Sequence, residues 1–359
     1  MPKKEDRMTD RERIEALLQR RKPDRVPIWP FASHGFAAVY RNLSIGDAYS
    51  NPRASYTAQR ETCRDFGWVF FPFFIYASMG AWEFGGEVKW PRGEFDQAPI
   101  VIRHPVEKDE DVYNLKWPGP DAGFFPLASE FGRIARSEWL DNEPFNSPIA
   151  GGACFSMCGN IAGVERFLRW LIKKPDLAHY LLRFIADWKL DTLLRQRESL
   201  GIDGVLPMGG EATTSNQLIS PRQFEEFAYP YIREIQEKVI DLGYKTSYVH
   251  ICGDQNLNLP IWAKIPFGDP GIISIGHEVK LETAALYFPD HIILGNLEPA
   301  IVQAGTPKEV YEATRKVVEE GKNIAGGYIF STGCDLPPKA PEINVRMMTK
   351  AVDDFGWYD

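Results

Sequence analysis

Residues 291–330 decide the fold. Their sequence is HIILGNLEPAIVQAGTPKEVYEATRKVVEEGKNIAGGYIF. An apolar run at residues 291–295 is followed by a helical pattern at residues 307–321 and then by a second apolar run at residues 325–330. Two short apolar runs with a helix between them are typical of parallel strands joined by a crossover helix. This segment therefore predicts one strand–helix–strand unit of a parallel sheet.

The same alternation recurs through the second half of the chain. Ser220 and Pro221 predict the start of a helix, because serine caps helix N-termini and proline fits the first helical turn. Further strands are expected at residues 203–209, 245–251 and 271–276, and a further helix at residues 341–354.

The first half carries weaker signals. A helix is expected at residues 9–20, a hairpin excursion at 82–103, strands at 26–29, 70–76 and 147–152, and another helix near 160–172. About eight strand–helix units predict a single (β/α)₈ TIM barrel domain. This domain is expected to span residues 1–359, with residues 1–24 as an N-terminal helical extension.

The composition is that of an ordinary globular protein. Hydrophobic residues make up 44% and charged residues 25% of the 359 residues. No apolar run reaches about 18 residues, so no transmembrane helix is expected. The net charge of −8 and the lack of a basic stripe argue against nucleic acid as a partner. Five cysteines without a disulfide framework, and an N-terminus without an apolar signal segment, predict a cytoplasmic protein.

A histidine and two cysteines form the clearest chemical motif. His250 and Cys252 end the strand expected at residues 245–251, and Cys334 follows the strand expected at 325–330. Alternate residues of an extended chain point to the same face. One imidazole and two thiolates suit zinc, and they leave a fourth position for a substrate. The alternative is a structural role for all three, because free cysteine is often buried.

Further polar residues fall at expected strand ends, where TIM barrels place their active sites. Glu211 is a candidate fourth ligand or substrate contact, or alternatively a charge at the N-terminus of a helix starting at Thr213-Thr214. His277 and Glu278 are candidates for substrate contact or proton transfer, or alternatively surface-loop residues. Asn296 is a candidate pocket residue or a hydrogen-bonding group at a strand end. Asp335 either supports the metal ligands or caps its loop.

Other features are assigned mainly to packing. His34 stands alone in a loop, where a single histidine usually has a structural role. Cys154 and Cys158 are expected to be ordinary thiols. The phenylalanine-rich residues 70–76 are core by default, although their alternate side chains are candidates for the wall of the barrel mouth. Aromatic residues make up 13% of the chain, which favours a pocket with aromatic walls.

Several motifs together carry a family resemblance. They are His250-Ile251-Cys252-Gly253, Gly295-Asn296-Leu297-Glu298-Pro299, and Gly333-Cys334 with Pro337 and Pro341-Glu342-Ile343-Asn344-Val345. In these motifs the chain resembles the uroporphyrinogen decarboxylase superfamily, and within it the zinc-dependent corrinoid (cobalamin) methyltransferase branch. That branch includes methylcobalamin:coenzyme M methyltransferases and the methyl-donor:corrinoid methyltransferases of O-demethylation systems. The similarity covers most of the chain and is loose between residues 35 and 200.

The resemblance implies a (β/α)₈ barrel and a zinc ion held by His250, Cys252 and Cys334. It also implies methyl transfer to or from the cobalt of a corrinoid, which a partner protein would carry. The arginine-rich N-terminal motif that holds propionates in the decarboxylases is not found, since Pro30-Phe31-Ala32-Ser33-His34-Gly35 stands in its place. Porphyrinogen decarboxylation is therefore not expected.

Three functions stay open. The first moves a methyl group from a small O-methyl compound, such as a methoxylated aromatic, to cobalt. The second moves a methyl group from methylcobalamin to a thiol such as coenzyme M. The third is a non-enzymatic, zinc-bearing barrel that docks a corrinoid partner. Two cysteinate ligands leave zinc with little positive charge, which suits thiolate activation without deciding between the first two functions.

Overall fold

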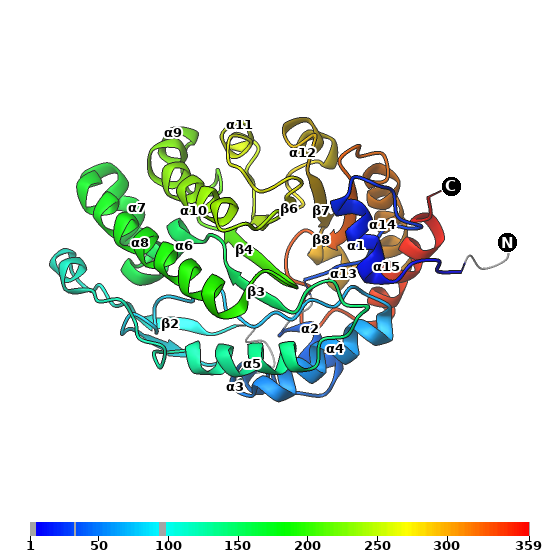
Figure 1. The fold of residues 1–359 in the computed structure, drawn as a ribbon, viewed down its shortest axis with the longest axis horizontal. Helices are drawn as coiled ribbons and strands as arrows, with labels where there is room; N and C mark the ends of the chain where they lie inside the picture. Colours follow the sequence, from blue (N-terminus) through cyan, green and yellow to red (C-terminus); the bar gives the residue numbers. More distant parts are fainter. Residues whose placement is uncertain (1–4, 32–33, 93–97, 359) are drawn as a thin grey trace.

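A six-stranded parallel sheet forms the centre of the molecule (Figure 1). The computed structural model describes residues 5–31, 34–92 and 98–358. The strands pair in chain order, and they are β3 (Ser147–Ala150), β4 (Val205–Glu211), β5 (Tyr248–Ile251), β6 (Ile272–Ile275), β7 (Ile292–Leu297) and β8 (Tyr328–Thr332). Helices connect consecutive strands, so the repeated strand–helix units predicted from the sequence are confirmed.

Two extended segments continue the sheet beyond β8. The backbone N–H of Trp29 donates to the carbonyl of Phe330, and that of Val69 donates to the carbonyl of Ile28, each at 2.8 Å. Ile28 and Phe330 also form a parallel bridge. The segments around Ile28 and Val69 therefore take the places of the first two strands of a TIM barrel.

Aromatic side chains join the second of these segments to the approach to β3. The rings of Trp29, Phe71 and Phe145 lie within 6.0 Å of one another. The arrangement is the predicted TIM barrel, but the regular strand predicted at residues 70–76 is wrong. Pro72 has no N–H to donate to a strand ladder, which explains why this stretch is extended without becoming a strand.

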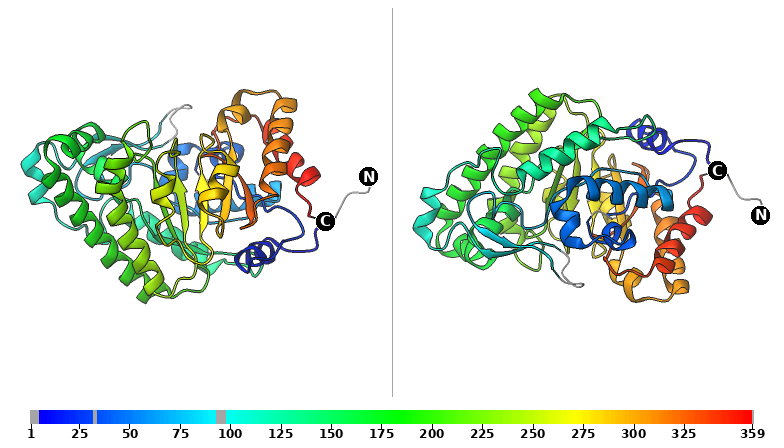
Figure 2. Two further views of the ribbon diagram at one scale, coloured as in Figure 1. Left: turned by 90° about the horizontal axis from the view of Figure 1, so that it is seen from above. Right: turned by 90° about the horizontal axis from the view of Figure 1, so that it is seen from below.

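Helices lie around the outside of the sheet (Figure 2). The α-helices are α1 (Asp10–Leu18), α2 (Phe36–Tyr40), α3 (Ile45–Ser50), α4 (Pro52–Phe66), α5 (Phe125–Ser137), α6 (Cys154–Ala162), α7 (Val164–Lys173), α8 (Pro175–Leu200), α9 (Pro221–Gln223), α10 (Tyr229–Asp241), α11 (Leu259–Trp262), α12 (Leu281–Tyr287), α13 (Pro299–Ala304), α14 (Pro307–Gly321) and α15 (Glu342–Phe355). The other elements are the 3₁₀-helix η1 (Asp109–Asn114), the π-helix η2 (Phe224–Ala228) and the antiparallel hairpin of β1 (Glu87–Lys89) and β2 (Ile100–Arg103). Within the described residues, no helix combines the length and apolar character needed to cross a membrane.

Most of the expected helices are found. The hairpin excursion is confirmed by β1 and β2, and the helix expected at residues 307–321 is α14. The helix expected near residues 160–172 is in fact two helices, α6 and α7, of which α6 starts earlier, at Cys154. Gly163 separates them with a φ of 82°, a left-handed conformation that favours glycine and interrupts a helix.

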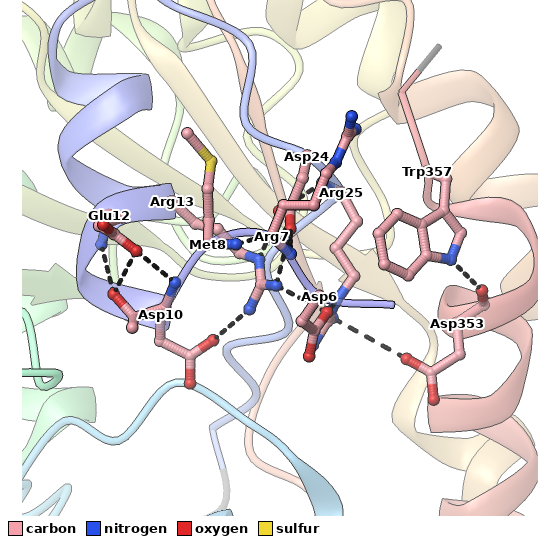
Figure 3. Close-up of polar contacts among 11 residues, drawn as sticks. Asp6, Arg7, Met8, Asp10, Glu12, Arg13, Asp24, Arg25, Asp353 and Trp357 are labelled. Atoms are coloured by element: carbon pink, nitrogen blue, oxygen red, sulfur yellow. Dashed lines mark hydrogen bonds and ion pairs between the residues drawn. The ribbon is translucent and has the colours of Figure 1, made fainter. Parts of the chain in front are cut away.

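The N-terminal end of the barrel is closed by α1. Its buried Ile14 and Leu17 belong to the same apolar cluster as Ile272 and Ile292, which begin β6 and β7. Beside them a buried ion pair joins Arg13 to Asp24 at 2.7 Å (Figure 3). Because this end is sealed by packing and charge pairing, the opposite end of the barrel is the one open to a site.

Candidate metal centre and substrate pocket

The three predicted metal ligands meet at the carboxyl end of the sheet. His250 lies in β5, Cys252 directly follows β5, and Cys334 lies in the loop after β8. One ligand atom from each lies within 4.8 Å of the others. The two sulfur atoms are 4.0 Å apart.

Hydrogen bonds hold both cysteine loops in place. The amide of Gln255 donates to the carbonyl of Cys252 at 3.1 Å, and the hydroxyl of Thr332 donates to the carbonyl of Cys334 at 2.6 Å. Gln255 is itself buried and accepts a hydrogen bond from the indole of Trp262 at 3.1 Å. The sulfur positions are therefore set by neighbouring polar groups, as a preorganised ligand set requires.

The imidazole of His250 is oriented by Ser274 of the neighbouring strand β6. Its Nδ1 lies 2.9 Å from the hydroxyl of Ser274, and its Nε2 is buried with no hydrogen-bond partner among the described residues. A buried polar nitrogen without a partner is costly and calls for a ligand. Tetrahedral zinc with metal–sulfur bonds of about 2.3 Å holds two sulfurs about 3.8 Å apart, close to the separation of Cys252 and Cys334. The donor set fits zinc in type and in spacing.

The pKa values of the two thiols are shifted in opposite directions. The hydrogen bond between the two sulfurs and, to a smaller extent, His250 lower the pKa of Cys334 to about 4 against the effect of burial. The same hydrogen bond to Cys334, together with burial, raises the pKa of Cys252. The shared hydrogen bond therefore favours a thiolate at this pair, and a thiolate is the form that ligates metals.

Glu211 lies at the end of β4, and its carboxylate binds the first turn of α6. It accepts hydrogen bonds from the backbone of Phe155 at 3.1 Å and from the backbone and hydroxyl of Ser156 at 2.8 Å and 2.6 Å. Burial raises the pKa of Glu211, although these hydrogen bonds and the charge of Lys189 oppose that effect. The carboxylate therefore lies at the N-terminus of α6, and residues 213–214, where the alternative reading expected a helix, form a turn.

The other candidate residues surround the loop after β6. His277 and Glu278 are both exposed, and Nδ1 of His277 lies 3.5 Å from a carboxylate oxygen of Glu278. The charge of Glu278 contributes to raising the pKa of Cys252, after the larger effects of Cys334 and of burial. Asn296 is buried, and its amide donates to the carbonyls of Gly276 at 3.2 Å and Val279 at 2.6 Å, which ties this loop to β7.

A cavity of about 590 Å³ opens beside His250 and Cys334. Its walls are mainly aromatic and aliphatic, and they are formed by Phe31, His34, Tyr49, Phe73, Ile75, Tyr76, Ala77, Lys89, Trp90, Pro91, Ala98, Ile100 and Asp335. Phe73 and Ile75 belong to the stretch whose alternate side chains are candidates for this wall. Tyr49 and Trp90 were missed, because a lone aromatic residue in a helix or hairpin gives no signal that distinguishes a cavity wall from a core.

A comparison with protein families gives a match over residues 9–355 to the uroporphyrinogen decarboxylase (URO-D) family. The chain belongs to this family. The resemblance inferred from the zinc-type motifs is thereby confirmed, and the relatives below include the methyltransferase branch named there.

Almost the whole chain matches relatives named as methyltransferases and relatives named as decarboxylases. The methylcobamide:CoM methyltransferase MtbA of Methanosarcina acetivorans is 29% identical over 97% of this chain and 99% of its own length. A uroporphyrinogen decarboxylase of Anaeromyxobacter dehalogenans is 24% identical over 96% of this chain and 99% of its own. A solved methyltransferase structure from Methanosarcina mazei superposes with a TM-score of 0.79 at 20% identity, covering 97% of this chain and 99% of that one, which shows the shared fold.

Proposed function

We propose that this protein is a corrinoid-dependent methyltransferase that holds a zinc ion at His250, Cys252 and Cys334. The observation that carries the proposal is the buried, unpartnered Nε2 of His250 in a group of donors that lie within 4.8 Å of one another. The full-length similarity to methylcobamide:CoM methyltransferases supports the methyl-transfer chemistry.

The residues around the centre have separate tasks. Ser274 holds the His250 ring so that Nε2 stays available, and the two cysteines supply the negative charge that a divalent cation needs. When bound, zinc would activate a thiol as a thiolate or polarise the oxygen of a methyl ether. The apolar cavity beside the centre would exclude water from the transferred methyl group.

The cavity supports an O-methyl aromatic compound as the methyl donor. Its volume of about 590 Å³ lies in the range of sites for ring-containing ligands. Phe31, Phe73 and Trp90 offer ring faces and edges to such a ligand. We propose that residues 1–359 form one barrel domain. The corrinoid would then arrive on a partner protein and present its cobalt at the open end of the barrel.

A second candidate is transfer from methylcobalamin to a thiol such as coenzyme M. The names of the similar methanogen proteins favour it, and so does the donor set, because two thiolates leave the metal with little positive charge. These observations concern the direction of methyl transfer. They do not change which residues are proposed to hold the zinc ion.

We propose supporting roles for the remaining candidate residues. His277 and Glu278 are proposed to contact the substrate or exchange a proton, because they pair in the loop after β6 and are exposed. Asn296 and Glu211 are proposed to act through the loop and the helix that they hold.

One pair of assays tests the proposal. Zinc-loaded protein is mixed with cob(I)alamin and 2-methoxyphenol, and separately with methylcobalamin and coenzyme M, and cobalamin absorbance is followed. Methylation of cobalt in the first mixture supports the ether reaction, and demethylation in the second supports the thiol reaction. The variant Cys334→Ala is the negative control. If neither mixture reacts, with free cobalamin or with a corrinoid carrier protein, the enzyme proposal fails and a non-enzymatic docking barrel is left.

A further inference from the structure

Three isoleucines form an exposed apolar surface where the cavity opens. Ile75 and Ile100 both line the cavity, and they are 38% and 56% exposed. Side chains that line a cavity and also reach solvent mark its opening. Ile102 is 59% exposed and lies two positions along β2 from Ile100, so both point to the same side of the strand. These three residues are called the isoleucine face below.

The isoleucine face belongs mainly to a hairpin that stands apart from the central sheet. Strands β1 and β2 form a separate two-stranded sheet (Figure 1). The hydroxyl of Ser78 donates to the carbonyl of Pro99 at 2.6 Å, which ties the segment after Ile75 to the start of β2. Val88 of β1 packs against the buried apolar cluster that contains Phe74. Part of the hairpin is thus packed on the core, whereas the isoleucines remain open to solvent.

The position of this face matches what a corrinoid requires. The reacting atoms of a methyl transfer approach to within about 3–3.5 Å, so cobalt has to reach a methyl group held in the cavity. Cobalt lies at the centre of a flat macrocycle. The ring must therefore extend sideways over the edge of the opening, where Ile75 and Ile100 lie and Ile102 follows.

The chemistry of the face also matches a corrin ring. The faces of the ring are largely hydrocarbon, and its amide groups lie at the periphery. An exposed group of aliphatic side chains beside a pocket is typical of an interaction surface. A second copy of the chain on the same face would cover the opening and keep out both the substrate and the corrinoid.

We propose that the isoleucine face is the surface on which the corrin macrocycle packs when its cobalt reaches the cavity. This inference rests on the proposed function, and it names the residues that receive the corrinoid. Packing on Ile75, Ile100 and Ile102 holds the ring plane across the opening, so that cobalt approaches the methyl group along the line of displacement. The apolar area that the ring covers contributes to its affinity.

Isothermal titration calorimetry of the zinc-loaded full chain with methylcobalamin tests this assignment. The wild type should bind methylcobalamin with a negative change in heat capacity, which marks the burial of apolar surface. Ile102→Glu should weaken binding about tenfold or more, because the ring would cover a carboxylate. Ile102 does not line the cavity, so this substitution leaves the wall of the substrate pocket unchanged.

Leu286→Glu is the matched control. Leu286 is 79% exposed near the end of α12, shortly before β7 begins, and therefore lies at the sealed end of the barrel. The control changes the net charge by the same amount as Ile102→Glu. It should bind methylcobalamin within about twofold of the wild type. If Ile102→Glu does not fold, Ile102→Ser decides by the same comparison, with a smaller but measurable loss of affinity.

Several results would overturn the assignment of the isoleucine face. They are unchanged affinity in the Ile102 variants, an equal loss in Leu286→Glu, a wild type that does not bind methylcobalamin, or a wild-type dimer that Ile102→Glu dissociates in analytical ultracentrifugation. The last result would assign the face to a second copy of the chain. Methylcobalamin binding through this face without any methyl transfer would retain the assignment and refute the proposed function. Methyl transfer with unchanged binding in Ile102→Glu would do the reverse.

Discussion

Ser274→Ala should weaken zinc binding and leave the fold intact. The Ser274 hydroxyl lies 2.9 Å from Nδ1 of His250, and the residue is fully buried. Loss of a partner that orients a metal ligand typically costs 10–100-fold in metal affinity. That factor corresponds to about 1.4–2.7 kcal/mol of binding free energy. Alanine removes only the hydroxyl from β6, so the surrounding packing is kept.

Competition against a chromogenic chelator measures this effect, and thermal unfolding of the apo-protein checks the fold. Ser331→Ala is the matched control. Ser331 lies on β8, is also fully buried, and its hydroxyl has no hydrogen-bond partner in the described part of the chain. It should bind zinc as tightly as the wild type. Wild-type zinc affinity in Ser274→Ala, or an equal loss in both variants, would refute the positioning of His250 by Ser274.

Three further predictions concern the metal and the sealed end of the barrel. Elemental analysis should find about one zinc per chain in the wild type, and Cys252→Ala and Cys334→Ala should each lose most of it. If both variants keep full zinc and full activity, these residues are not part of the site. Chelation should abolish methyl transfer with little change in far-UV circular dichroism, because the barrel has a large core of its own; cooperative unfolding on chelation would contradict this. Burial would raise the pKa of Asp24, but the hydrogen bonds from Arg13 and from neighbouring backbone N–H groups lower it to about 2. Since the folded pKa lies below the unfolded value, the stabilisation by Asp24 is present above about pH 4 and is lost as the pH falls toward 2. Asp24→Asn should flatten this acid-induced loss in urea titrations and lower the free energy of unfolding at pH 7 by about 3 kcal/mol, because buried Arg13 loses a partner; an unchanged pH profile would show that the pair does not carry that dependence.

The regular part of the fold could be read from local patterns. Residues 307–321 combine a threonine cap, a proline at the first turn and an apolar stripe, and they form α14. The sequence places strands at the first two barrel positions, near residues 26–29 and 70–76, but local patterns do not show that these segments pair irregularly. Their backbone donates to distant partners, as Trp29 does to Phe330, and Pro72 interrupts the nearby ladder. Contacts across hundreds of residues leave no local period in the sequence.

The sequence by itself determined the residue types at the candidate metal centre and their places at strand ends. The alternation of an extended chain puts His250 and Cys252 on one face of a strand, and residue chemistry makes Cys334 a candidate third ligand. Only the tertiary structure decided that Cys334 lies 4.0 Å from Cys252, that Glu211 binds α6, and that His34 lines the cavity. Strand periodicity fixes which way a side chain points, but the distances between side chains from different elements depend on how those elements pack.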